Sequence, residues 1–121
     1  MAQLNSFREL VVWQKAMDLA ETCYLLTRPF SRQDEALGNE IRKSCVSIPS
    51  NIAEGFGRHS SREYVHHLWI SNGSGNELQT QIGVGHRVKI VSDHEAATII
   101  RDTEEVGRML RGLARSISKR F

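Results

Sequence analysis

The sequence predicts an all-α protein, an antiparallel up-down-up-down four-helix bundle, and three observations predict this fold class. Apolar residues recur at helical spacing in four segments, about residues 8–27, 34–56, 61–86 and 93–119. Each segment begins near a serine that is followed three residues later by an acid, which is the pattern of a capping box. These pairs are Ser6/Glu9, Ser31/Asp34, Ser60/Glu63 and Ser92/Glu95. The links between segments are a few residues long, so neighbouring helices are expected to be antiparallel, within one domain spanning 1–121.

The first segment is apolar over a wide arc from Val12 to Leu26, and Pro29 ends it. An arc wider than one stripe predicts contact with more than one neighbour. The fourth segment is the clearest, because its apolar positions alternate steps of three and four residues. They are Ala96, Ile99, Thr103, Val106, Leu110, Leu113 and Ile117. This 3.5-residue period is typical of left-handed bundle packing.

The second segment contains the stretch SIPSNIAEGFGRHSS, whose proline and glycines suggest two interpretations. A phosphate-binding loop is disfavoured, because Ser60 replaces the third glycine of the dinucleotide fingerprint and a helix precedes the stretch. The apolar face keeps its phase from Leu37 to Ile52, which predicts one helix that continues, kinked, through Pro49. We then expect Gly55 or Gly57 to supply a left-handed cap.

The third segment runs from Ser61 through Leu68 and Leu78, and the sequence is compatible with two positions for its end. Glycines at positions 83 and 85 are poor helix formers, so the helix ends either near Ile82 or after a frayed last turn.

Composition excludes several classes of protein. The net charge is only +2, which does not by itself imply a nucleic-acid or membrane partner. Cys23 and Cys45 are too few for a disulfide framework or a zinc site, so we interpret both as reduced core thiols. The longest apolar run is four residues and no secretory signal is visible, so we expect a cytoplasmic protein without a membrane partner.

Two groups of basic residues are candidate anion-binding sites. Arg108, Arg111, Arg115 and Lys119 form one stripe on the fourth helix. The stripe is either a ridge that contacts phosphates or a solvated face that complements the helix dipole. The second group lies where the N–H groups of the third helix point, and it consists of Arg58, Ser60, Ser61 and Arg62.

Other polar residues are interpreted structurally. Four of them lie beside apolar faces, and we predict that they form an interhelical or intersubunit network: Arg42, Asn51, Glu54 and Glu77. Glu63 and His66 form a single E-x-x-H pair, whereas di-iron bundles use two pairs and two more carboxylates. We therefore predict a capping glutamate and a solvated histidine, no metal or cofactor, and no catalytic residue.

Three stretches of the chain resemble a known family. FRELVVWQKAMDLA, IRKSCVSIPSNIAEGFGR and SNGSGNELQTQI are similar to the "four-helix bundle protein" family, also called ribosomal-RNA intervening-sequence proteins, from Phe7 to Leu113. The resemblance implies an antiparallel four-helix bundle that assembles as a ring-like homopentamer. It also implies a distant relation to the accessory proteins of diversity-generating retroelements, which are basic pentamers that engage nucleic acid and a reverse transcriptase. The family has no catalytic residues to carry over.

These observations predict a non-enzymatic oligomeric scaffold that associates with RNA or DNA through basic surfaces. One alternative is a protein-interaction module without nucleic acid, and another is a metal-dependent bundle enzyme that uses Glu63 and His66.

Overall fold

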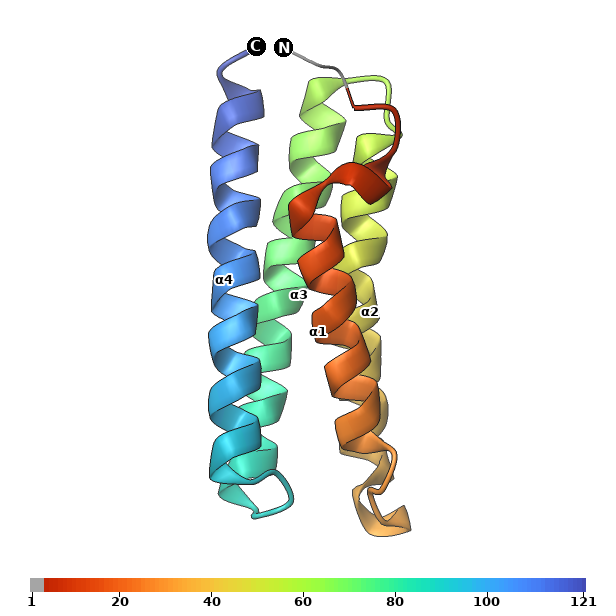
Figure 1. Ribbon diagram of the computed structural model, residues 1–121, viewed down its shortest axis with the longest axis vertical. Coiled ribbons are helices and arrows are strands. Elements are labelled where there is room, and N and C mark those ends of the chain that lie inside the picture. Colours follow the sequence, from red (N-terminus) through yellow and green to blue (C-terminus); the bar gives the residue numbers. More distant parts are fainter. Residues whose placement is uncertain (1–3) are drawn as a thin grey trace.

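The computed structural model describes residues 4–121, and four long helices hold most of them. The helices are α1 (Val11–Thr27), α2 (Glu35–Phe56), α3 (Ser61–Arg87) and α4 (Asp93–Ser118). Short 3-10 helices, η1 (Phe7–Glu9) and η2 (Arg32–Asp34), precede α1 and α2. Figure 1 shows that each helix runs opposite to the one before it, so that α1 begins at the end of the bundle where α4 finishes. The predicted four-helix bundle is confirmed; residues 1–3 of the predicted 1–121 range lie outside the described residues.

The serine signals at α3 and α4 cap these helices in the predicted way. The Ser92 hydroxyl accepts from the Glu95 N–H at 3.1 Å, and the Glu95 carboxylate accepts from the Ser92 N–H at 2.9 Å. This is a complete capping box. At α3 the Ser60 hydroxyl accepts from the Glu63 N–H at 3.0 Å, which forms half of a box.

The two earlier serine signals act differently. Ser6 caps η1 by accepting from the Arg8 N–H, and α1 begins only at Val11, three residues later than predicted. Ser31 makes no cap bond, because its hydroxyl donates to the Asp34 carboxylate instead. A serine–acid spacing of three thus marks a turn in every case and the start of an α-helix in only two.

We expect Ser92→Ala to lower the free energy of unfolding by about 1 kcal/mol, because it removes a complete N-terminal cap. Ser31→Ala should change it by less than about 0.5 kcal/mol, since Ser31 caps no helix. Urea unfolding of both variants at one protein concentration checks this. Equal losses would contradict the assignment of the caps.

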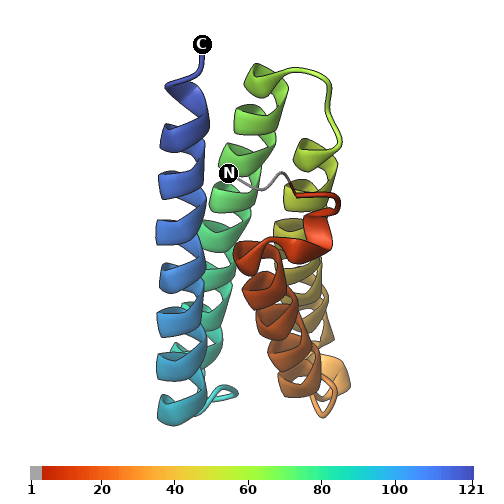
Figure 2. The ribbon, with the colours of Figure 1, turned by 45° about the horizontal axis from the view of Figure 1, so that its top comes forward.

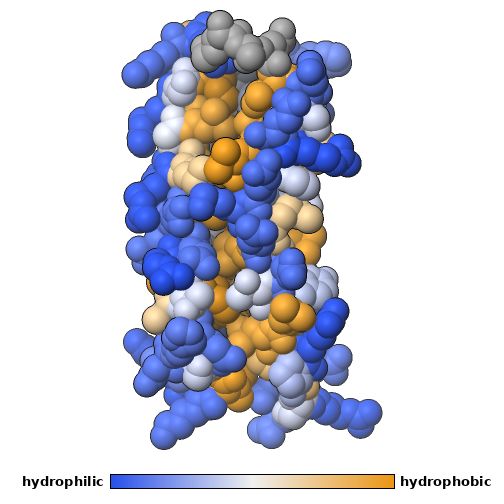
Figure 3. Space-filling view, viewed as in Figure 1, coloured by the Kyte–Doolittle hydropathy of each residue, from blue (hydrophilic) through white to orange (hydrophobic). Residues whose placement is uncertain are grey.

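The core is built from the inward faces of all four helices, and the phase of α4 differs from prediction at one position. Ala114 is buried and Leu113 is only half-buried. The predicted 3.5-residue alternation placed Leu113 inside, but an α-helix repeats every 3.6 residues and drifts by about 20° per heptad. Ala114 lies 18 residues after Ala96, which is five full turns of such a helix, so it returns to the core face. Figure 3 shows that apolar surface also remains visible in a band along the face where α1 and α4 lie.

Helix α2 continues through Pro49, as predicted, and α3 packs closely against this region. The Ser71 hydroxyl on α3 donates to the Ile48 carbonyl at 2.8 Å, directly before the proline. The Ser47 and Ser74 hydroxyls bond across the same interface, also at 2.8 Å. Small hydroxyl side chains therefore allow the two helices to approach closely. One of them also donates a hydrogen bond to a backbone carbonyl beside Pro49.

The predicted left-handed glycine cap is wrong. Gly57 ends α2 with a φ of −82°, and no glycine among the described residues has a positive φ. The left-handed residue is Lys89, with a φ of 69°, in the α3–α4 link. Gly55 serves another purpose, since a Cβ there would lie 2.8 Å from the Cβ of His67. Glycine at 55 is needed for helix approach.

The predicted core thiols are confirmed. Cys23 on α1 and Cys45 on α2 are both free and buried. A hydrogen bond to Cys45 and burial raise the pKa of the Cys23 thiol. Cys45 in turn lies within 3.3 Å of the Arg42 carbonyl. The two side chains thus fill space between α1 and α2 as buried free thiols.

Candidate nucleic-acid interface

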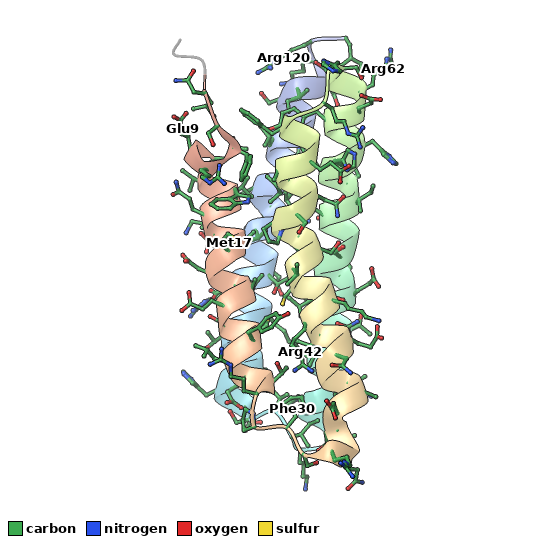
Figure 4. The ribbon with its side chains drawn as sticks, turned by 90° about the vertical axis from the view of Figure 1, so that its right-hand side faces the viewer. Glu9, Met17, Phe30, Arg42, Arg62 and Arg120 are labelled. Carbon is green, nitrogen blue, oxygen red and sulfur yellow. The ribbon has the colours of Figure 1, made fainter. Side chains whose placement is uncertain are left out.

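One end of the bundle gathers exposed cations from three helices. Here α2 ends, α3 begins and α4 ends, and Figure 4 labels Arg62 and Arg120 at this end. We call it the basic end and define it by its cations: Arg58, Arg62, Arg115, Lys119 and Arg120. All five are exposed. The antiparallel topology causes this arrangement, because the start of α3 and the finish of α4 share one end.

Contacts between the α3 start and the chain after α4 fix this end. The Arg62 guanidinium carbon lies 4.6 Å from the centre of the Phe121 ring, which is a cation–π distance. Burial raises the pKa of the Tyr64 phenol, and the nearby charge of Arg120 partly opposes that shift. Phe56 packs edge-on against Tyr64 at 6.1 Å. Aromatic rings therefore lie among the cations.

The basic end holds more net charge than the whole chain. Residues 50–66 and 112–121 contain five Lys and Arg residues against two Asp and Glu residues, a net of +3. The whole chain has a net charge of +2. The rest of the chain therefore has a net charge close to zero. The positive potential of the molecule is concentrated at the basic end.

The predicted stripe on α4 divides into two parts. Arg115 and Lys119 belong to the basic end, whereas Arg111 is half-buried and donates to the Asn72 amide oxygen at 3.0 Å. Arg108 is exposed midway along α4 and helps to lower the pKa of Glu105. The larger cause of that lowering is the hydrogen bond from Lys15, at 2.9 Å.

The predicted anion site at the α3 start is partly occupied by the protein itself. Arg58 forms an ion pair with Glu54. The Ser60 hydroxyl accepts from the Glu63 N–H, and Ser61 is exposed. Arg62 makes no ion pair within residues 4–121. Arg62 is thus the member of this set that is best placed to bind an anion.

Comparison with known proteins identifies the family. Residues 8–112 match the family described as 23S rRNA-intervening sequence protein. The chain belongs to this family. It is also similar to a crystal structure of a protein with unknown function from the S23 ribosomal protein family of Bacteroides thetaiotaomicron. The two align with a TM-score of 0.82 at 20% identity, over 87% of this chain and 96% of that chain. A comparison with curated proteins found no match.

In this member of the 23S rRNA-intervening sequence protein family, the four predicted network residues do not bond to one another. Asn51 donates to the Ser47 carbonyl and pairs with the His67 Nδ1 at 3.0 Å, which links α2 to α3. Arg42 bonds within α2, to Asn39, and Glu54 bonds to Arg58. Glu77 is exposed. A network between subunits stays a prediction.

The E-x-x-H pair on α3 does not form part of a metal cluster among the described residues. Glu63 and His66 are both exposed on α3. Within residues 4–121 no cluster of three His, Cys, Asp or Glu side chains is placed to hold a metal ion. Over the same residues, no helix has both the length and the apolar character needed to cross a bilayer.

The sequence patterns did not assign the aromatic rings or Arg120 to the basic end of this family member. The signal was present, because Arg120 directly follows the stripe and antiparallel helices must bring the α4 finish to the α3 start. Along α4 alone the stripe is one helix face on which no aromatic residue is interleaved. Tyr64 belongs to α3, and Phe121 follows α4 and lies against Arg62 of α3.

Proposed function

We propose that the protein is a non-enzymatic, oligomeric helical scaffold that binds RNA through its basic end. The observation that supports this most is the concentration of five cations against two acids there. Four of the five make no ion pair within the described residues, so their charge is available to a partner: Arg62, Arg115, Lys119 and Arg120.

Single-stranded RNA fits the chemistry of this end. Phosphates bind exposed Lys and Arg side chains, and bases stack on aromatic rings placed among them. The Phe121 ring is 50% exposed and already lies against the Arg62 guanidinium. A single strand can place a base on this ring and its phosphates on the neighbouring cations.

The test is the salt dependence of binding to a single-stranded RNA oligonucleotide. Four phosphate contacts per protomer predict a slope of log affinity against log salt of about −3. Fluorescence anisotropy between about 50 and 200 mM salt measures this slope. An affinity that stays constant over this range would contradict the proposal and favour a protein-interaction module instead.

The oligomeric part of the proposal is supported by apolar side chains on the face that α1 and α2 share. Met17, Tyr24 and Val46 are each more than 40% exposed. Met17 and Tyr24 are seven residues apart on α1, and Tyr24, Arg42 and Val46 line one depression. Figure 4 looks onto this side and labels Met17 and Arg42. We propose it as the self-association face, covered by a second copy of the chain.

We expect Val46→Glu to reduce the oligomeric mass in solution, because it buries a charge in the self-association face. Val88→Glu is the matched control, since Val88 is 58% exposed and is the first residue of the α3–α4 link. Light scattering compares each mass with the 13.7 kDa of one chain. An unchanged mass for Val46→Glu, or an equal loss in both variants, would reject this face.

A further inference from the structure

A groove between α3 and α4 combines polar groups that the basic end does not use. Figure 2 shows these two helices side by side along their lengths. The cavity measures about 220 Å³, and its polar walls are Asn72, Asn76 and Gln79 on α3 with Glu104 and Arg111 on α4. That volume equals roughly seven water molecules in the liquid, which is room for a ring system.

Helical spacing places the wall residues on facing surfaces. Asn72, Asn76 and Gln79 are separated by four and three residues, so they share one face of α3. Gly75 and Gly107 lie between the walls, and a Cβ on Gly75 would meet only the Thr103 methyl, at 3.4 Å. The absence of side chains at these two positions keeps the groove open.

Arg111 is held at one end of the groove. Its guanidinium donates to Asn72 and covers Gly107, where an added Cβ would lie 3.0 Å from the Arg111 Nη1. Within the described residues it has no carboxylate partner. A half-buried guanidinium with one neutral acceptor keeps further N–H groups free, and an anion such as phosphate satisfies them best.

Glu104 provides the opposite chemistry at the other end. It precedes Arg111 by seven residues, which is two turns or about 10 Å along the same helix face. Asn76 and Gln79 lie on the wall opposite, and their side chains bond to no other described residue. The groove therefore offers a cation, neutral amides and then a carboxylate, in that order.

We propose that this groove binds one guanine nucleotide, with the phosphate on Arg111 and the base edge on Glu104. A carboxylate only accepts hydrogen bonds, and guanine presents two adjacent donors, N1–H and the N2 amino group. Uracil presents a single donor between two acceptors, and adenine and cytosine each place an acceptor beside their amino group. The amide N–H groups of Asn76 and Gln79 complete the match by donating to the guanine O6.

This inference rests on the proposed function for the source of the nucleotide. The nucleotide is either free guanosine monophosphate or one unstacked residue of a bound RNA strand, and both present the same base and phosphate. The groove is separate from the basic end, so each site can be tested without altering the other.

The experiment is calorimetric titration of the full chain with guanosine monophosphate, guanosine and the other three monophosphates. We expect saturable binding in which guanosine monophosphate is tightest. Glu104→Gln should weaken it about tenfold, the effect of one lost charge-assisted hydrogen bond. Arg111→Gln should weaken the binding of guanosine monophosphate by a similar factor and leave the affinity for guanosine unchanged. Glu77→Gln is the matched control, because Glu77 is exposed on the same helix pair outside the groove.

Gly107→Ala tests binding in the groove without lowering the stability of the folded protein. Alanine is the better helix former, and its Cβ displaces the Arg111 guanidinium, so binding should weaken in a well-folded protein. No saturable binding in the millimolar range, or equal binding of all four monophosphates, would overturn the inference.

The source is distinguished with two RNA strands, oligouridine and oligouridine with one central guanosine. Preference for the second strand that is lost in Glu104→Gln places the groove in RNA binding. Equal affinity for both strands, with guanosine monophosphate still bound, assigns the groove to a free nucleotide. If neither strand binds while guanosine monophosphate does, the result contradicts the proposed RNA binding and supports the guanine nucleotide site in the groove.

Discussion

Replacing Arg62, Lys119 and Arg120 together by glutamine should weaken binding to single-stranded RNA about 50-fold at 0.15 M salt. The three residues lie at the basic end and form no ion pair within residues 4–121. Each phosphate contact adds about 0.7 to the slope of log affinity against log salt, so removing three flattens the slope by about 2. The expected loss follows from that change of slope, extrapolated to a 1 M reference.

A matched control removes the same charge from the opposite end of the bundle. Arg28, Arg32 and Arg87 are exposed near the end of α1, in η2 and at the end of α3. Replacing these three by glutamine should leave the slope unchanged and alter the affinity only slightly. Equal weakening in both triple variants would mean that overall charge, and not the basic end, determines binding. Anisotropy titrations at several salt concentrations separate the two outcomes.

Gly55→Ala should lower the free energy of unfolding by about 1–3 kcal/mol, the range of an overpacked core position. The new Cβ would lie 2.8 Å from the His67 Cβ and 3.2 Å from the Tyr64 carbonyl oxygen. Both atoms are fixed to the α3 backbone, so the helices must separate near the basic end. That movement also strains the hydrogen bond between Asn51 and His67.

Gly112→Ala is the control of opposite sign. Apart from the adjacent residues and the nearby backbone of α4 itself, no atom lies within 4 Å of the position that its Cβ would occupy. Alanine should therefore stabilise α4 by up to about 1 kcal/mol through helix propensity alone. Chemical unfolding of both variants at one protein concentration measures the difference. A stabilised Gly55→Ala would show that α2 and α3 approach less closely than described.

The helices were predictable because their signals are local and repeated. Continuity of α2 through Pro49 followed from the apolar phase on either side of it, and the structure keeps that phase. The choice between Leu113 and Ala114 was not predictable to one residue. It depends on how far α4 drifts from a 3.5-residue repeat, which packing against α1 and α3 decides.

The candidate site was only partly predictable, because it is formed across helices. Arg111 has the right spacing for the basic stripe, yet Asn72 and Gly107 hold it in the groove. Sequence spacing along α4 contains no information about Asn72 on α3. Likewise, the α3 anion group and the α4 stripe were separate predictions, and the bundle topology brings part of each to one end.

The basic end joins the start of α3 to the residues that follow α4, so it exists only when the bundle is folded. A ligand that binds the folded chain and not the unfolded chain shifts the folding equilibrium by mass action. At a free concentration one hundred times its dissociation constant, such a ligand adds about 2.7 kcal/mol to stability. Resistance of the protein to unfolding and to proteolysis would then depend on how much RNA partner is present.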